Sequence, residues 1–290
     1  MPELPEVETI RLFLKNNIIG KKIISIDILN KKSLSADPKN IIGQKIFKLS
    51  RTGKQLSIYL DNKFLLLIHL KMTGQLIYVA KEITALGHPL DEFTRRSLGE
   101  GGPWKSTRVI FTFSDKSKLY FNDQRKFGWI KLIKQIDLKN LQSSLGPDIL
   151  SPNFTLQYFQ TILKDSTCFI KTFLHDQSKL AGVGNIYAND ALFLSSIHPK
   201  VRCNQITKAQ SKSLYQNIKK VIRQGITYGG STAKDNMYLK PDGSKGDQQY
   251  NFLVYQKTGE SCLKCGNIII RLKLQGHSAF FCPHCQKLSK

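Results

Sequence analysis

Four of the six cysteines form two closely spaced pairs near the C-terminal end of the sequence. Cys262 and Cys265 are separated by two residues, as are Cys282 and Cys285, and sixteen residues lie between the pairs. Two-residue spacing lets one turn present both thiolates to the same tetrahedral ion. A redox pair would need a βαβ unit, which the pattern lacks. We therefore interpret the four cysteines as the ligands of one structural Zn²⁺.

The segment around these cysteines is too short to bury a core of its own, at about 40 residues. Zinc binding would supply the folding free energy that the segment lacks. Cys168 and Cys203 stand alone in the sequence. We interpret them as small buried hydrophobic residues rather than ligands.

The N-terminus is a second candidate for chemistry. Removal of Met1 would leave Pro2 with a secondary amine, and an α-amino group titrates near ~8, so part of it is nucleophilic at neutral pH. Attack on an aldehydic sugar carbon would form an iminium, which favours elimination, and Glu3 and Glu6 are candidate acids beside it. The residues alone leave a second interpretation open, in which this proline-rich start only leads rigidly into a helix.

The charge of the chain points to a polyanionic partner. Among 290 residues there are 44 Lys and Arg but 21 Asp and Glu, a formal net charge of +23. Basic side chains that pair with phosphates release condensed counterions. The sequence has neither an apolar run near the ~18 residues of a membrane span nor the start of a secretory signal. We expect a protein of the reducing cytoplasm rather than a membrane protein or a disulfide scaffold.

The elements that must position these residues indicate an α+β multidomain fold. A helix led by Pro5 precedes short apolar segments separated by turn residues, which predict an N-terminal antiparallel β-sandwich domain over 1–135. Strands are expected at 23–29, 45–49, 56–60, 64–70, 75–79, 109–113, 118–121 and 128–133.

The period then becomes helical over 136–228, where Thr207 is a predicted N-cap. A polar, Gly-rich loop follows at 229–250. The last domain, 251–290, carries the cysteines on a β-hairpin with expected strands at 268–274 and 279–281.

Six sequence blocks, in order along the chain, resemble those of the formamidopyrimidine-DNA glycosylase family. The first five are PELPEVET at 2–9, HLKMTG at 69–74, DQRKFG at 123–128, LGP at 145–147 and GVGNIYA at 182–188, and the paired cysteines are the sixth. The resemblance covers the chain apart from 83–107, a polar insertion that predicts a surface loop.

This resemblance implies a bifunctional DNA glycosylase and apurinic/apyrimidinic lyase that repairs oxidised purines. It implies that Pro2 attacks the sugar C1′ and forms a Schiff base, and that Glu3 assists as the sugar ring opens. Lys54 would donate a proton during β,δ-elimination and contact phosphate. The expected partner is damaged double-stranded DNA, bound by a nucleoid-associated monomer without a small-molecule cofactor.

The resemblance also implies DNA contacts. Met72, Arg125 and Phe127 would fill the gap left by an extruded nucleotide. Asn185 would belong to a helix–two-turns–helix domain that holds a phosphate at a helix N-terminus. The loop at 229–250 would cap the extruded lesion.

One departure weakens the expected DNA grip. His277 stands where the family's zinc hairpin carries an arginine, and histidine lacks the bidentate fork of arginine. We expect weaker binding that strengthens as the pH falls through about 6.5. Two alternatives stay open: the sister glycosylase that prefers oxidised pyrimidines, and a non-catalytic zinc protein that binds damaged DNA.

Overall fold

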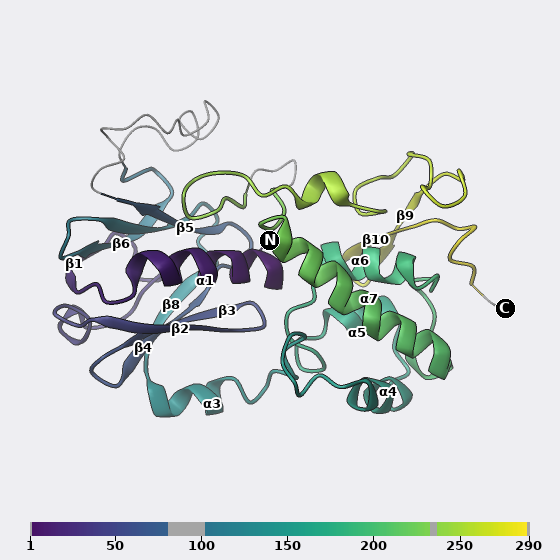
Figure 1. Ribbon diagram of the computed structural model, residues 1–290, viewed down its shortest axis with the longest axis horizontal. Coiled ribbons are helices and arrows are strands. Elements are labelled where there is room, and N and C mark those ends of the chain that lie inside the picture. The colour runs from purple at the N-terminus through teal and green to yellow at the C-terminus, as the bar shows by residue number, and fades with distance from the viewer. Residues whose placement is uncertain (1, 81–101, 233–236, 289–290) are drawn as a thin grey trace. The chain divides into compact units, whose positions relative to one another are not determined.

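A computed structural model describes residues 2–80, 102–232 and 237–288 of the chain (Figure 1). The chain divides into two compact units. Unit 1 comprises Met1–Gln142 and Tyr228–Asp247, and unit 2 comprises Ser143–Thr227 and Gln248–Lys290. The later segment of unit 1 therefore returns to the N-terminal part of the chain after unit 2 has begun.

Unit 1 is built on two four-stranded antiparallel sheets. One sheet has the order β1-β6-β7-β5, and the other has the order β2-β3-β4-β8. The strands are β1 (Ile23–Ile28), β2 (Ile46–Thr52), β3 (Gln55–Leu60), β4 (Phe64–His69), β5 (Gly74–Val79), β6 (Thr107–Phe113), β7 (Lys118–Asp123) and β8 (Trp129–Lys134). The eight predicted strands are confirmed, with shifts of a few residues at their ends.

One hydrophobic core joins both sheets to the first helix, α1 (Leu4–Ile18). Ile10, Leu14 and Ile18 on α1 are fully buried in this core, beside residues of both sheets such as Leu66 and Phe121. Short helices η1 (Pro38–Asn40), η2 (Gln135–Asp137) and α3 (Leu138–Leu141) complete the first part of the unit. The burial of α1 fixes the position of the chain's N-terminal residues.

Unit 2 begins as a group of helices. They are α4 (Leu156–Lys164), α5 (Ile170–His175), α6 (Asn185–Leu194), η3 (Cys203–Gln205) and α7 (Lys208–Thr227). The predicted N-cap is confirmed, because the Thr207 hydroxyl accepts a hydrogen bond from the Gln210 amide at 3.2 Å. Helices α6 and α7 approach closely at Gly225, where a Cβ atom would lie 2.5 Å from the Tyr187 ring.

The hairpin of β9 (Ile270–Leu274) and β10 (His277–Phe281) follows η4 (Gln248–Asn251) and packs on α6. The Asn189 side chain on α6 accepts a hydrogen bond from the Phe280 amide at 2.9 Å. Asp190 accepts bonds from the amides of residues 253–255. The hairpin, which is itself part of unit 2, therefore shares a core with α6, in which Phe193 packs with Ile269 and Phe280.

The observed architecture confirms the predicted α+β multidomain fold with its sandwich, helical part and hairpin. The surface-loop prediction for the insertion falls mostly outside the described residues, which resume at 102. In the parts of the chain that the structure describes, no helix has the length and apolar character needed to cross a membrane.

Candidate active site and zinc centre

The N-terminal residues are buried and held in place by the start of α1. Glu3 is the N-cap residue, and its backbone amide donates to the Glu6 carboxylate at 2.8 Å, one half of a capping box. The second oxygen of Glu6 accepts from the Ser231 amide at 2.9 Å. Pro2 and Glu3 are both buried. The capping box that begins α1 therefore also holds the candidate nucleophile, Pro2, and the candidate acid, Glu3, in place.

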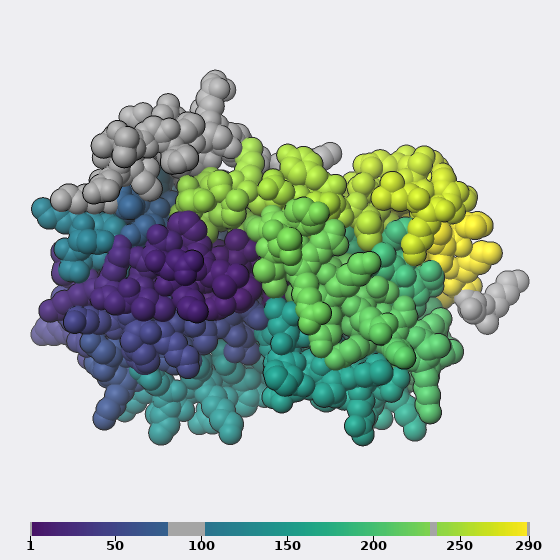
Figure 2. Space-filling model, in the orientation of Figure 1, coloured from purple at the N-terminus to yellow at the C-terminus, as the bar shows by residue number. Residues whose placement is uncertain are grey.

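The contact with Ser231 places the later segment of unit 1 against α1. In Figure 2 the yellow-green chain of this segment lies beside the purple N-terminal helix. Tyr238 is also buried there, and its hydroxyl donates to the Gly229 carbonyl at 3.0 Å. Within the expected capping loop, the described residues up to Asp247 belong to unit 1, and residues 248–250 belong to η4 of unit 2. Residues 233–236 lie outside the described residues.

Lys54 occupies a two-residue turn between β2 and β3. Gly53, at the first central position, has a φ of 55°, the conformation that a type II′ hairpin turn requires and that glycine supplies without strain. Lys54 itself is only 8% exposed. A lone lysine near a strand end is usually solvated, so its burial is a distinguishing feature of this turn.

The protonation of Lys54 is set by its surroundings. Burial lowers the pKa of the amine below its usual value, the carboxylates of Glu3 and Glu6 partly restore it, and the charge of Lys71 lowers it again. The structure thus brings Lys54 into the electrostatic reach of the two N-terminal acids. An ammonium in this position releases its proton more readily than a solvated lysine does.

An ion-pair network connects α1 to the Gly53–Lys54 turn. The Glu8 carboxylate on α1 accepts from Arg51 at 3.0 Å and from Arg11 at 2.7 Å. Arg51 also donates to the Gly53 carbonyl at 2.8 Å, and its side chain is 6% exposed. Sequence reasoning missed this role for Glu8 and Arg51, because nothing in their spacing indicates that helix and turn meet.

Two neighbouring turns of the sandwich carry the expected insertion residues Met72, Arg125 and Phe127. Met72 lies on the β4–β5 turn and is 39% exposed, and Phe127 lies on the β7–β8 turn and is 53% exposed. The Arg125 guanidinium lies 4.9 Å from the centre of the Phe127 ring. Singly exposed apolar side chains are common on protein surfaces, so the distinguishing feature here is that Met72, Arg125 and Phe127 share two neighbouring turns.

A single buried aspartate ties the two turns together. Asp123 accepts hydrogen bonds from the Thr73 hydroxyl and from the amides of Arg125 and Gly128, at 3.2 and 2.6 Å for the amides. The Thr73 hydroxyl in turn accepts from the Arg125 amide at 3.0 Å. Sequence reasoning included Asp123 in a motif without assigning it a role, although Asp before a turn is a recognised signal.

His69 opens the turn that carries Met72 and stays neutral. Burial first, and then the charges of Lys71 and Lys54, lower its pKa to about 3. Its Nδ1 atom accepts a hydrogen bond from the Lys71 amide at 3.0 Å. The histidine therefore acts as a fixed acceptor that shapes the turn.

Asn185 is the first residue of α6 in unit 2. It follows Gly184, and the buried amine of Lys171 donates to its backbone carbonyl at 3.2 Å. The N-terminal end of a helix is a common binding place for a phosphate oxygen. The phosphate contact of Asn185 stays a prediction.

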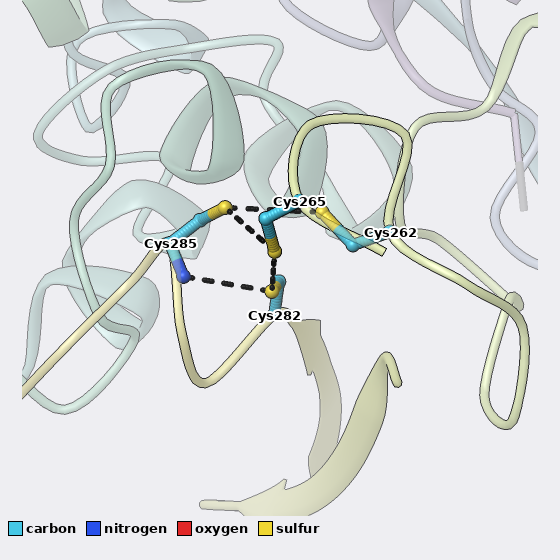
Figure 3. A group of neighbouring side chains, drawn as sticks. All are labelled: Cys262, Cys265, Cys282 and Cys285. Atoms are coloured by element: carbon cyan, nitrogen blue, oxygen red, sulfur yellow. Dashed lines mark hydrogen bonds between the residues drawn. The ribbon is translucent and has the colours of Figure 1, made fainter. Parts of the chain in front are cut away.

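The four paired cysteines converge on one point (Figure 3). Their sulfur atoms lie within 4.8 Å of one another. Burial first, and then the neighbouring thiols, raise the pKa of Cys285 to about 12, whereas a divalent cation favours the thiolates. A soft four-sulfur donor set of this kind fits a structural Zn²⁺ and leaves no position open for a substrate. The cluster confirms the predicted ligands as one group.

His277 lies at the start of β10 and is exposed. Its ring packs on that of His175, with 4.5 Å between the ring centres. Where the family carries an arginine, this chain therefore has one member of a histidine pair. The predicted pH dependence of DNA binding stays a prediction.

The chain combines a two-sheet domain, a helical part and a four-cysteine hairpin with a fitting Zn²⁺ donor set, and comparisons with known proteins identify this class of protein as a DNA-repair glycosylase. The formamidopyrimidine-DNA glycosylase N-terminal domain matches residues 1–130, the H2TH domain of the same glycosylase matches 145–237, and a zinc finger found in FPG and IleRS matches 259–288. The chain belongs to the formamidopyrimidine-DNA glycosylase family.

Individual relatives are similar along their whole length. The formamidopyrimidine-DNA glycosylase of Protochlamydia amoebophila is 37% identical, with 99% of this chain and 100% of the relative covered. A solved Lactococcus lactis FPG bound to Fapy-dG containing DNA has a TM-score of 0.87 at 32% identity, over 99% of this chain and 100% of that one. The Thermus thermophilus MutM (FPG) structure has a TM-score of 0.85 at 31% identity, with both chains fully covered.

Proposed function

We propose that this glycosylase removes oxidised purines, 8-oxoguanine and formamidopyrimidines, from duplex DNA and then cleaves the abasic strand. The observation that carries the proposal is the buried group of Pro2, Glu3 and Lys54, which we name the reaction centre. A lysine and a proline without a chemical role would normally stay in water, whereas these two are buried beside Glu3 and Glu6, whose charges act on Lys54.

Removal of Met1 frees the amine of Pro2, which attacks C1′ of the damaged nucleotide. The C1′–N bond breaks, the base leaves with the proton that the Pro2 amine loses, and Glu3 passes a proton from solvent to the ring oxygen as the sugar opens. The product is an iminium between Pro2 and C1′. This electron sink acidifies the C2′ hydrogen, whose loss expels the 3′ phosphate, and a second elimination expels the 5′ phosphate.

Lys54 donates the proton that these eliminations require and contacts the phosphate. Its burial supports this role, since a lowered pKa makes the ammonium a better acid. The base must leave the helical stack before Pro2 can reach C1′. Met72, Arg125 and Phe127, which we name the insertion residues, fill the resulting gap, and their exposure on two joined turns supports this role.

The helical part of unit 2 holds the backbone phosphates through the α6 N-terminus at Asn185. The segment 229–250 caps the extruded base. We retain the division into a catalytic domain at 1–135, a DNA-binding domain at 136–228 and a zinc domain at 251–290 as the functional description. The proposal that these parts bind damaged DNA is supported by the high net positive charge and by solved relatives in complex with damaged DNA.

Borohydride trapping tests the covalent step. Duplex DNA carrying 8-oxoguanine should give a stable protein–DNA adduct whose linkage maps to Pro2. Pro2→Gly with Glu3→Gln should abolish the adduct. Binding of the damaged duplex without any adduct would instead favour a non-catalytic damage binder, and strong preference for an oxidised pyrimidine would favour the sister specificity.

Removal of zinc tests the role of the cysteine cluster. Cys265→Ser leaves three ligands, so we expect loss of bound zinc and at least about a 100-fold loss of DNA affinity. Unit 1 has its own core and should keep its circular dichroism signal. Cys168→Ser is the matched control, and full affinity in Cys265→Ser would contradict a structural role.

A further inference from the structure

The two cysteines outside the zinc cluster, which are far apart in the sequence, lie opposite each other in unit 2. Phe169 and Arg202 form an antiparallel bridge, so the preceding Cys168 faces the following Cys203. The Cys203 amide donates to the Cys168 carbonyl at 3.0 Å. Directly opposed residues of an antiparallel pair have Cα atoms about 4.5–5.5 Å apart. That separation lies within the range that a disulfide spans.

The two thiols are also close enough for Cys168 to affect the pKa of Cys203. Burial raises the pKa of Cys203 well above its usual value, and the charge and hydrogen bonding of Cys168 raise it further. Cys168 is half-buried, whereas Cys203 is 1% exposed. The sulfur of Cys168 lies 3.2 Å from the Ser166 hydroxyl, a polar neighbour able to donate a hydrogen bond to a thiolate. The pair thus has one accessible and one enclosed member.

We propose that Cys168 and Cys203 form a reversible redox pair that hydroperoxides convert into an intramolecular disulfide. The Cys168 thiolate attacks the peroxide oxygen and the O–O bond breaks. Cys168 becomes a sulfenic acid, and the other oxygen leaves as an alcohol or water. The Cys203 sulfur then attacks the sulfenic sulfur and displaces water. In total, two thiols and one hydroperoxide give one disulfide, one alcohol or water molecule, and one further water.

The position of the bond gives it a structural effect. The segment between the cysteines contains α5 and the whole of α6, including Asn185. A disulfide here closes a loop of about 36 residues, which restricts the unfolded chain. Disulfides in a reducing compartment are commonly transient and redox-sensing. This inference does not depend on the proposed reaction or its substrate.

Peptide mapping of the zinc-loaded full chain tests the bond directly. After treatment with hydrogen peroxide and blocking of free thiols, trypsin should release residues 165–171 joined to 203–208, two hydrogens lighter than the separate peptides. Dithiothreitol should restore both peptides. The oxidised protein should melt at least about 5 °C higher than the reduced protein.

Single variants identify the order of attack. Cys203→Ser should accumulate a sulfenic acid at Cys168 that dimedone traps, whereas Cys168→Ser should leave Cys203 unmodified because it is enclosed. Sulfinic acid at Cys168 of the wild-type protein without the joined peptides would overturn the proposal. Joining of either cysteine to one of the zinc ligands would overturn it equally.

Discussion

The reaction centre and the insertion residues belong to the same unit but have opposite surroundings. Glu3 and Lys54 are enclosed, with exposures of 2% and 8%, and the capping box fixes the start of α1. Phe127 is about half exposed, and only the backbone of its turn is tied down, through Asp123. Covalent chemistry needs fixed geometry and controlled protonation, whereas a residue that enters DNA must remain uncovered until DNA arrives.

This contrast separates the expected effects of mutation. Changes in the reaction centre should mainly reduce the rate of chemistry, with an additional loss of DNA binding only where the phosphate contact of Lys54 is removed. Changes in the insertion residues should weaken binding and base extrusion, with little effect on stability because their side chains bury little surface in the free protein.

The largest effect is expected for Glu3→Gln. The glutamine keeps an oxygen for the helix cap but cannot transfer a proton, so base excision should fall by roughly 10²–10⁴-fold. The free energy of unfolding should change by less than about 1 kcal/mol. Single-turnover excision and urea denaturation measure the two quantities. Glu8→Gln, on the same helix, is the matched control. If excision by Glu3→Gln stayed within tenfold of wild type, Glu3 would not belong to the reaction centre.

Lys54→Met should slow strand cleavage of a preformed abasic site by about 100-fold. The pH dependence sharpens this expectation. Because the pKa of Lys54 is lowered from 10.5, the ammonium is lost as the pH rises through that lowered value, and the alkaline fall in rate should begin below pH 10.5.

Lys71→Met provides the control for this pH profile. The charge of Lys71 lowers the pKa of Lys54, so its removal should move the alkaline fall to higher pH. Single-turnover cleavage measured across the alkaline range gives the position of the fall. An unmoved profile in Lys71→Met would show that another group controls it.

A smaller effect is expected for Arg125→Ala. Loss of the guanidinium beside Phe127 should raise the Kd for a damaged duplex by about tenfold, with stability within about 0.5 kcal/mol. Fluorescence anisotropy at fixed salt measures the Kd. Lys139→Ala removes the same charge from an exposed position on α3 and should have less effect. Equal losses in the two variants would mean that Arg125 contributes only charge.

The smallest effect on activity is expected for Glu8→Gln, which leaves two arginines without their carboxylate. The free energy of unfolding should fall by about 1–2 kcal/mol, while excision stays within a few fold of wild type.

The stability deficit of Glu8→Gln should depend on pH. Burial opposes ionisation of Glu8, but the hydrogen bonds and charges of Arg11 and Arg51 outweigh it and lower the pKa below 4.5. A lowered carboxyl pKa stabilises the fold above pH 4.5, and this stabilisation is lost as the pH falls through the folded value. Urea denaturation should therefore show a deficit at neutral pH that disappears in acid. A deficit independent of pH would indicate lost packing instead.

Local patterns predicted much of the molecule. Alternation of apolar residues and turn signals identified the eight strands, Thr207 marked the start of α7, and the cysteine spacing identified the metal ligands. These features depend on neighbours within a few residues, or on a donor set with one common chemistry. The enclosure of Lys54 and the support from Arg51 could not be read in this way, because they depend on the meeting of α1 with a distant turn.

The cysteine pair shows the same limit. Cys168 and Cys203 were interpreted as isolated hydrophobic residues, and burial of Cys203 agrees with that interpretation. Their opposition across a bridge between residues 169 and 202 arises only when the helices of unit 2 fold back.

The amino-acid sequence alone determined the elements, the metal ligands and the family resemblance, since these follow from periodicity, spacing and residue type. The tertiary structure decided which of the charged groups lose their water, as Lys54 does, and which side chains stay exposed, as Phe127 does. Solvation and electrostatic energies depend on what surrounds a group in space, and segments distant in the chain supply those surroundings.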